Sequence, residues 1–184
     1  MPTMWYELDI NDRFVAVSED WNASSDMLGA PNNVFENIRY LPVWDFVAGE
    51  ETQRFLRAMF FWVRNKRRPI VLPYQLENMG DASHFRMRIE PLHQGGLLVS
   101  HDPDDVPGGA PQLLPYTTKD LTRCSQCLKI NIDGVWYNAE PESELHECSD
   151  WRVCPDCKER ALNLVRQPTG APVARYARAT LGKF

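Results

Sequence analysis

The sequence predicts an α+β fold in which an antiparallel sheet carries helices on one face and a small cysteine-bearing module follows. Two regions of alternating hydrophobicity flank a central segment whose apolar residues recur every three to four positions. Strands, then helices, then strands are typical of a sheet whose helices gather on one side. The five cysteines of this 184-residue chain all lie within residues 124–157, after a stretch rich in proline and glycine.

The first elements are two short strands and a long helix. Residues 5–16 are strand-like with a turn at Asn11-Asp12-Arg13, and residues 18–31 are polar and broken, which suits short helical turns. Residues 50–68 are expected to form a helix, with acidic residues at its start and basic residues at its end that complement the helix dipole. Its apolar stripe consists of Phe55, Leu56, Met59, Phe60, Trp62 and Val63.

Three further strands follow the helix. Apolar residues alternate with others over residues 70–76, and again over residues 84–90, where one face of the strand is polar. The turn Gln94-Gly95-Gly96 then leads into a strand over residues 97–100, so these last two strands form a hairpin.

A proline- and glycine-rich stretch divides the chain. Residues 102–115 hold four prolines and two glycines, which rules out a helix or a central strand there. We therefore expect a first domain over residues 1–101, a linker over 102–118, a cysteine module over 119–167 and a basic, flexible tail over 168–184.

The cysteine module carries two Cys-x-x-Cys pairs, Cys124 with Cys127 and Cys154 with Cys157, separated by 26 residues. This spacing lets four thiolates surround one ion, and it predicts a closed tetrahedral zinc site that is structural because no coordination position stays open. A hairpin with an Asp-Gly turn over residues 129–137 and a helix starting at Pro155 complete an arrangement like a treble-clef or zinc-ribbon module. Redox chemistry and reduced structural thiols are the alternatives.

Cys148 is left over. A fifth ligand, a reactive thiol and a small loop residue are the three interpretations, of which the last is preferred because Glu144, Glu147 and Asp150 would raise its pKa and lower its reactivity. The roles of Cys148 and of His146 stay open.

The element order resembles that of PAS-type sensory domains. Residues 41–47 end a region of small helices, a long helix follows, and residues 85–92 lead into the Gly-Gly hairpin. Bacterial PAS-like proteins with this order often end in a Cys-x-x-Cys and a Cys-Pro-x-Cys segment, which match Cys124 to Cys127 and Cys154 to Cys157 here. The resemblance extends to about Leu162 and implies a sensory domain, often dimeric, with a zinc module. Where such proteins often carry a histidine before the second pair, this chain has Trp151.

The sequence contains no convincing set of catalytic residues, so we expect that the protein is not an enzyme. It lacks the nucleophile-elbow, phosphate-loop and dinucleotide motifs. His84, His93 and His101 are interpreted as solvated side chains, and the helix over residues 50–68 has no histidine of the kind that haem-binding PAS domains carry. The absence of cysteine before residue 124 excludes covalent flavin photochemistry but leaves a noncovalent small ligand open.

Aromatic and sulfur-bearing side chains of the first domain have two interpretations, the wall of a ligand pocket or an ordinary packed core, and the core is preferred. They are Trp44, Phe55, Phe60, Trp62, Phe85 and Met87.

Charge favours a signalling or regulatory protein over a nucleic-acid binder. The 20 basic and 25 acidic residues give a net charge of −5, whereas nucleic-acid-binding domains are typically basic. A small ligand and a protein partner or second copy are the expected partners. The alternative is a zinc-dependent nucleic-acid binder that uses the helix starting at Pro155 and the tail around Arg175 and Arg178. Without a signal peptide or an apolar run of about 18 residues, we expect a cytoplasmic protein with no membrane span.

Overall fold

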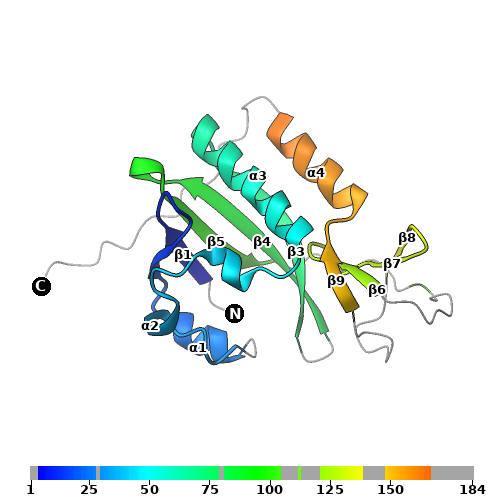
Figure 1. The fold of residues 1–184 in the computed structure, drawn as a ribbon, viewed down its shortest axis with the longest axis horizontal. Helices are drawn as coiled ribbons and strands as arrows, with labels where there is room; N and C mark the ends of the chain where they lie inside the picture. The colour runs from blue at the N-terminus through cyan, green and yellow to red at the C-terminus, as the bar shows by residue number, and fades with distance from the viewer. Residues whose placement is uncertain are drawn as a thin grey trace, which may run out of the picture.

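Two sheets and four α-helices make up the part of the chain that the computed structural model describes, which is residues 4–27, 30–78, 81–104, 112, 121–138 and 148–166 (Figure 1). The predicted linker lies largely outside these residues, as do the acidic loop with His146 and the basic tail with Arg175 and Arg178. No described helix is both long enough and apolar enough to cross a bilayer.

The larger sheet is antiparallel throughout, with the strand order β2-β1-β5-β4-β3. Its strands are β1 (Met4–Leu8), β2 (Phe14–Val17), β3 (Ile70–Asn78), β4 (Asp81–Pro91) and β5 (Leu97–Pro103). The predicted hairpin joins β4 to β5 through the 3₁₀ turn η2 (His93–Gly95), in which Gly95 has a φ of 80° that glycine adopts freely. β5 ends at Pro103, two residues into the range assigned to the linker, because it pairs with β4 as far as Phe85.

Helices between β2 and β3 cover one face of this sheet, which confirms the predicted α+β class (Figure 1). They are α1 (Trp21–Met27), α2 (Phe35–Ile38), the 3₁₀ turn η1 (Val43–Phe46) and α3 (Glu50–Lys66). The apolar stripe of α3 faces the core, where Phe60 and Val63 are almost fully buried. Arg64, at the end of α3, is paired with Asp12 at 2.7 Å and donates to the carbonyl oxygens of Asp9 and Gly95. This side chain therefore links the end of α3 to the turn between β1 and β2 and to the turn between β4 and β5.

The smaller sheet has the order β8-β7-β6-β9. It comprises β6 (Leu121–Cys124), β7 (Ile130–Ile132), β8 (Val135–Tyr137) and β9 (Cys148–Arg152), and α4 (Pro155–Arg166) follows. β7 and β8 form the predicted hairpin with its Asp-Gly turn. β9 was not predicted: it pairs in parallel with β6, and it makes Cys148 a strand residue where a loop residue was expected.

The cysteine module packs directly on the first domain. Ala161 of α4 joins the main core, with Leu164 and Val165 packed beside it. At the start of α3, Gly49 lies against Trp151 of β9 so closely that a Cβ added there would be 2.3 Å from the Trp151 carbonyl oxygen. Figure 1 shows β9 beside this end of α3. The described parts of the two domains are thus in contact through α3, α4 and β9.

Candidate metal centre and adjoining cavity

The first cysteine pair sits in a tight turn at the end of β6. The Leu128 amide donates to the Cys124 carbonyl at 3.0 Å, and the Gln126 amide donates to the Cys124 sulfur at 3.4 Å. Leu128 has a φ of 57°, which lets the chain reverse immediately after Cys127. Both thiols of the pair therefore face the same point.

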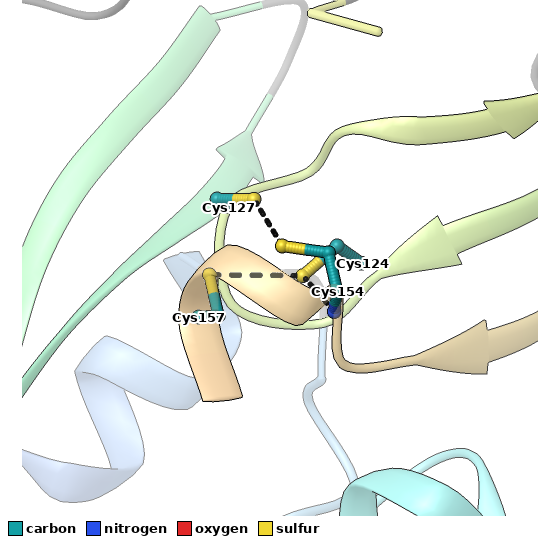
Figure 2. A group of neighbouring side chains, drawn as sticks. All are labelled: Cys124, Cys127, Cys154 and Cys157. Atoms are coloured by element: carbon teal, nitrogen blue, oxygen red, sulfur yellow. Dashed lines mark hydrogen bonds between the residues drawn. The ribbon is translucent and has the colours of Figure 1, made fainter. Parts of the chain in front are cut away.

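The second cysteine pair sits at the start of α4. Pro155 occupies the first helical position, where its missing amide proton costs nothing. Cys157 lies within the first turn of this helix, and the Cys154 amide donates to the Cys124 sulfur at 3.3 Å. This contact joins the two pairs, as the dashed lines in Figure 2 show.

The four sulfurs lie within 4.8 Å of one another, as predicted from the spacing of the pairs (Figure 2). Cys124 Sγ is 4.0 Å from Cys157 Sγ, and Cys127 Sγ is 3.6 Å from Cys154 Sγ. Four thiolates around zinc at about 2.3 Å stand about 3.8 Å apart, whereas a disulfide needs about 2.05 Å. The spacing matches a metal shell and does not match a disulfide.

The electrostatics of the cluster also suit a cation. Hydrogen bonds from the other three thiols lower the pKa of the Cys124 thiol, while a hydrogen bond shared with Cys124 raises the pKa of the Cys157 thiol. The thiols therefore compete for negative charge, and a divalent cation held by Cys124, Cys127, Cys154 and Cys157 would remove that competition by binding all four as thiolates.

Cys148 lies apart from the group of four cysteines. It packs against a separate apolar cluster formed by Leu121, Ile130 and Ile132.

A cavity of about 610 Å³ lies between the helices and the sheet and extends to the cysteine module. Its lining is mainly aromatic and aliphatic. Its described polar side chains are those of Asn33, Thr52, Gln75, His101, Arg123, Ser125 and Gln126, together with the hydroxyls of Tyr6 and Tyr74 and the indole of Trp21 and Trp151.

The predicted pocket residues divide between this cavity and the core. Met87 lines the cavity, whereas the buried side chains of Trp44, Phe60 and Phe85 are absent from its described lining. Phe55 is partly buried between the main core and the cysteine cluster, and Trp62 packs against the core from outside.

His101 corrects one sequence-based interpretation. The sequence placed it as a solvated residue at the start of the linker, but it lies on β5, is partly buried and lines the cavity. The Tyr74 hydroxyl is 2.8 Å from its Nδ1, and burial lowers its pKa to about 4, so the ring is neutral at neutral pH. Residues 100–103 carry no aliphatic alternation, so only the pairing of His101 with Met4 of β1 and Met87 of β4 shows that β5 continues through it.

The other two histidines among the described residues do not line this cavity, and His146 lies outside those residues. His84 contacts the Gln75 side chain at 2.6 Å, and His93 is exposed in the turn η2.

Comparison with known proteins found similar structures only. No family model matches the sequence, and no curated protein matches it. The PAS domain of the quorum-sensing receptor RpfR from Cronobacter turicensis, solved with C12:0, is 13% identical, with a TM-score of 0.42, over 56% of this chain and 94% of that domain.

Two further structures were found at a similar level. A domain of a sensory box histidine kinase/response regulator from Geobacter sulfurreducens is 12% identical, with a TM-score of 0.38, over 54% of this chain and 82% of the other. A phage VqmA–DPO complex is 19% identical, with a TM-score of 0.38, over 56% of this chain and 47% of that one, so the match spans about half of its length.

Proposed function

We propose that this chain is a noncatalytic signalling or regulatory protein whose PAS-like domain binds a small molecule in the cavity and whose cysteine module is held by a structural zinc ion. The observation that carries this proposal is the cavity itself. It lies where helices cover the sheet, and about 610 Å³ falls within the range of small-molecule sites in proteins, which is about 300–1,000 Å³. A protein partner or a second copy of the chain would receive the signal.

The lining favours an uncharged, largely apolar ligand with one polar group. Among the described lining residues only Arg123 is permanently charged, and its Nε already donates to the Leu128 carbonyl oxygen. The Tyr74–His101 pair supplies a hydrogen-bonding point, because the Tyr74 hydroxyl and the neutral imidazole each offer a donor or an acceptor. Burial raises the pKa of Tyr74, so this pair adds no charge to the cavity at neutral pH.

Zinc would act on the fold and not on a substrate. Cys124, Cys127, Cys154 and Cys157 would hold it, and a four-thiolate shell leaves no position for a reacting molecule. When bound, zinc supplies a positive charge that keeps the four thiolates together and so fixes the two turns on β6 and α4.

The nucleic-acid alternative finds less support. Ala161 of α4 is buried in the main core, and Lys158 of the same helix is ion-paired with Glu51 of α3. One of the three basic side chains of this helix is therefore already paired within the chain, and the face that carries Ala161 is covered by the first domain.

The experiment is a titration with N-phenyl-1-naphthylamine, an uncharged aromatic dye that fluoresces in apolar surroundings. Leu76→Trp fills the cavity from β3, and Leu162→Trp adds the same bulk to an exposed site on α4. We expect the dye to bind the unchanged protein and the Leu162→Trp variant and to lose most of its affinity for Leu76→Trp. Equal binding by the two variants would show that the dye does not enter this cavity, and failure of the unchanged protein to bind would contradict the proposal.

A further inference from the structure

The cavity wall on the module side is built from the turn that carries the first cysteine pair. Ser125 and Gln126, which lie between Cys124 and Cys127, both line the cavity, and Leu128 follows Cys127 directly. The turn that holds these three residues therefore lies between the four cysteines and the cavity.

This turn is fastened to the first domain on the cavity side. The Gln75 amide on β3 donates to the Gln126 carbonyl at 2.8 Å, and the Thr52 hydroxyl on α3 lies 2.9 Å from the Ser125 Oγ. Gln75 and Thr52 also line the cavity. The turn is therefore both a wall of the cavity and a junction between the two domains.

The shape of the turn depends on the cysteine cluster. The Gln126 amide donates to the Cys124 sulfur, and the Cys154 amide donates to that sulfur from the second pair. An ion bonded to all four sulfurs, which lie within 4.8 Å of one another, would fix the turn against the second pair, whereas without it only weak hydrogen bonds to sulfur hold the turn in place. The loop would then no longer hold Gln126 and Leu128 against the cavity.

We propose that the metal ion and the cavity ligand bind with positive coupling, so that loss of the metal opens the cavity wall and releases the ligand. This inference rests on the proposed function. By linkage, each partner must strengthen the binding of the other by the same factor. The cysteine centre would thereby make the sensor respond to zinc supply as well as to its ligand.

The test measures zinc affinity by competition with the chelator 4-(2-pyridylazo)resorcinol, with and without saturating N-phenyl-1-naphthylamine. We expect the dye to tighten zinc binding by about tenfold, within the ~5–150-fold usual for coupled sites. The measurement starts from the zinc-loaded protein, so it remains decisive even if the stripped module unfolds. The reciprocal titration should show weaker dye binding after zinc is removed.

The outcomes separate this inference from the proposed function. If the dye binds the loaded protein and zinc affinity does not change, the coupling is overturned and the ligand cavity stands. If the dye does not bind, both fail.

A pair of glycine variants tests the route of coupling. Gly49→Ala forces β9 away from α3 and should shrink the factor, while Gly134→Ala, which also has a positive φ but has nothing within 4 Å of an added Cβ, should retain it. An unchanged factor in Gly49→Ala would contradict a route through this junction.

Discussion

Substitution of Gly49 by alanine tests the packing of the cysteine module on the first domain. Gly49 has φ 79° and ψ 124°, a conformation that L-residues rarely adopt, and a strained residue of this kind costs about 1–3 kcal/mol. The added Cβ would also meet the Trp151 carbonyl oxygen at 2.3 Å and the Trp151 Cβ at 2.8 Å, so β9 and α3 must move apart. The backbone strain is confined to residue 49, whereas the movement also separates the cysteine turn from the first domain.

The movement would break the two hydrogen bonds that join the cysteine turn to Thr52 and Gln75. Each contributes about 1 kcal/mol. Together with the backbone strain, Gly49→Ala should lower the free energy of unfolding by about 3–5 kcal/mol. Gly134→Ala places alanine at a φ of 89° with open space around it, so it should cost only the strain of about 1–3 kcal/mol.

The assay is urea unfolding of the two zinc-loaded variants and the unchanged protein, followed by tryptophan fluorescence at a fixed zinc concentration. Gly49→Ala should be less stable than Gly134→Ala by about 2 kcal/mol, the contribution of the junction. If the two variants are equally stable, Gly49 does not hold the domains together and the packing argument is refuted.

Three further results are expected. Cys124→Ser should abolish zinc binding, whereas Cys148→Ser should retain it because Cys148 packs in a separate cluster. The measurement is the zinc content of each variant after gel filtration. Loss of zinc from both variants would contradict the assigned ligand set. Burial lowers the pKa of His101 to about 4 from about 6.5 when unfolded, so the unfolded chain binds the extra proton and stability falls by about 3 kcal/mol as pH drops from 6.5 through 4. His101→Asn should show a shallower fall than the unchanged protein in urea unfolding at each pH, and parallel curves would show that His101 does not carry this dependence. Arg64→Met should lower the free energy of unfolding by about 3–5 kcal/mol, because it leaves the half-buried Asp12 carboxylate without its cation and removes the hydrogen bonds to Asp9 and Gly95. Arg54→Met, which breaks an exposed pair, should lower it by less than about 1 kcal/mol. Equal thermal shifts in the two variants would contradict the structural role of Arg64.

Local pattern predicted most elements of the first domain. The three-to-four-residue stripe around Phe60 and the acidic and basic ends of α3 act within the helix itself, so its position followed from sequence. The paired cysteines were equally readable, because two residues between thiols is a spacing that one turn imposes. The sequence also located the β7–β8 hairpin through its Asp-Gly turn.

Long-range pairing could not be predicted in the same way. β9 is short and mostly polar, and only its parallel pairing with β6 makes it a strand. The contact of Gly49 with Trp151 joins residues about one hundred positions apart, and neither side carries a local signal of the other. Residues of both domains line the cavity, so aromatic content alone left pocket wall and packed core open for Trp44 and Phe60, which pack in the core as preferred.

Native mass spectrometry of the freshly purified chain tests the central claim most directly, because it reports bound metal, retained small molecule and subunit number in one spectrum. The account predicts one zinc ion per chain, lost on acidification, with all four clustered cysteines reduced. A folded chain that carries no metal and whose mass shows those cysteines joined in disulfides would contradict it.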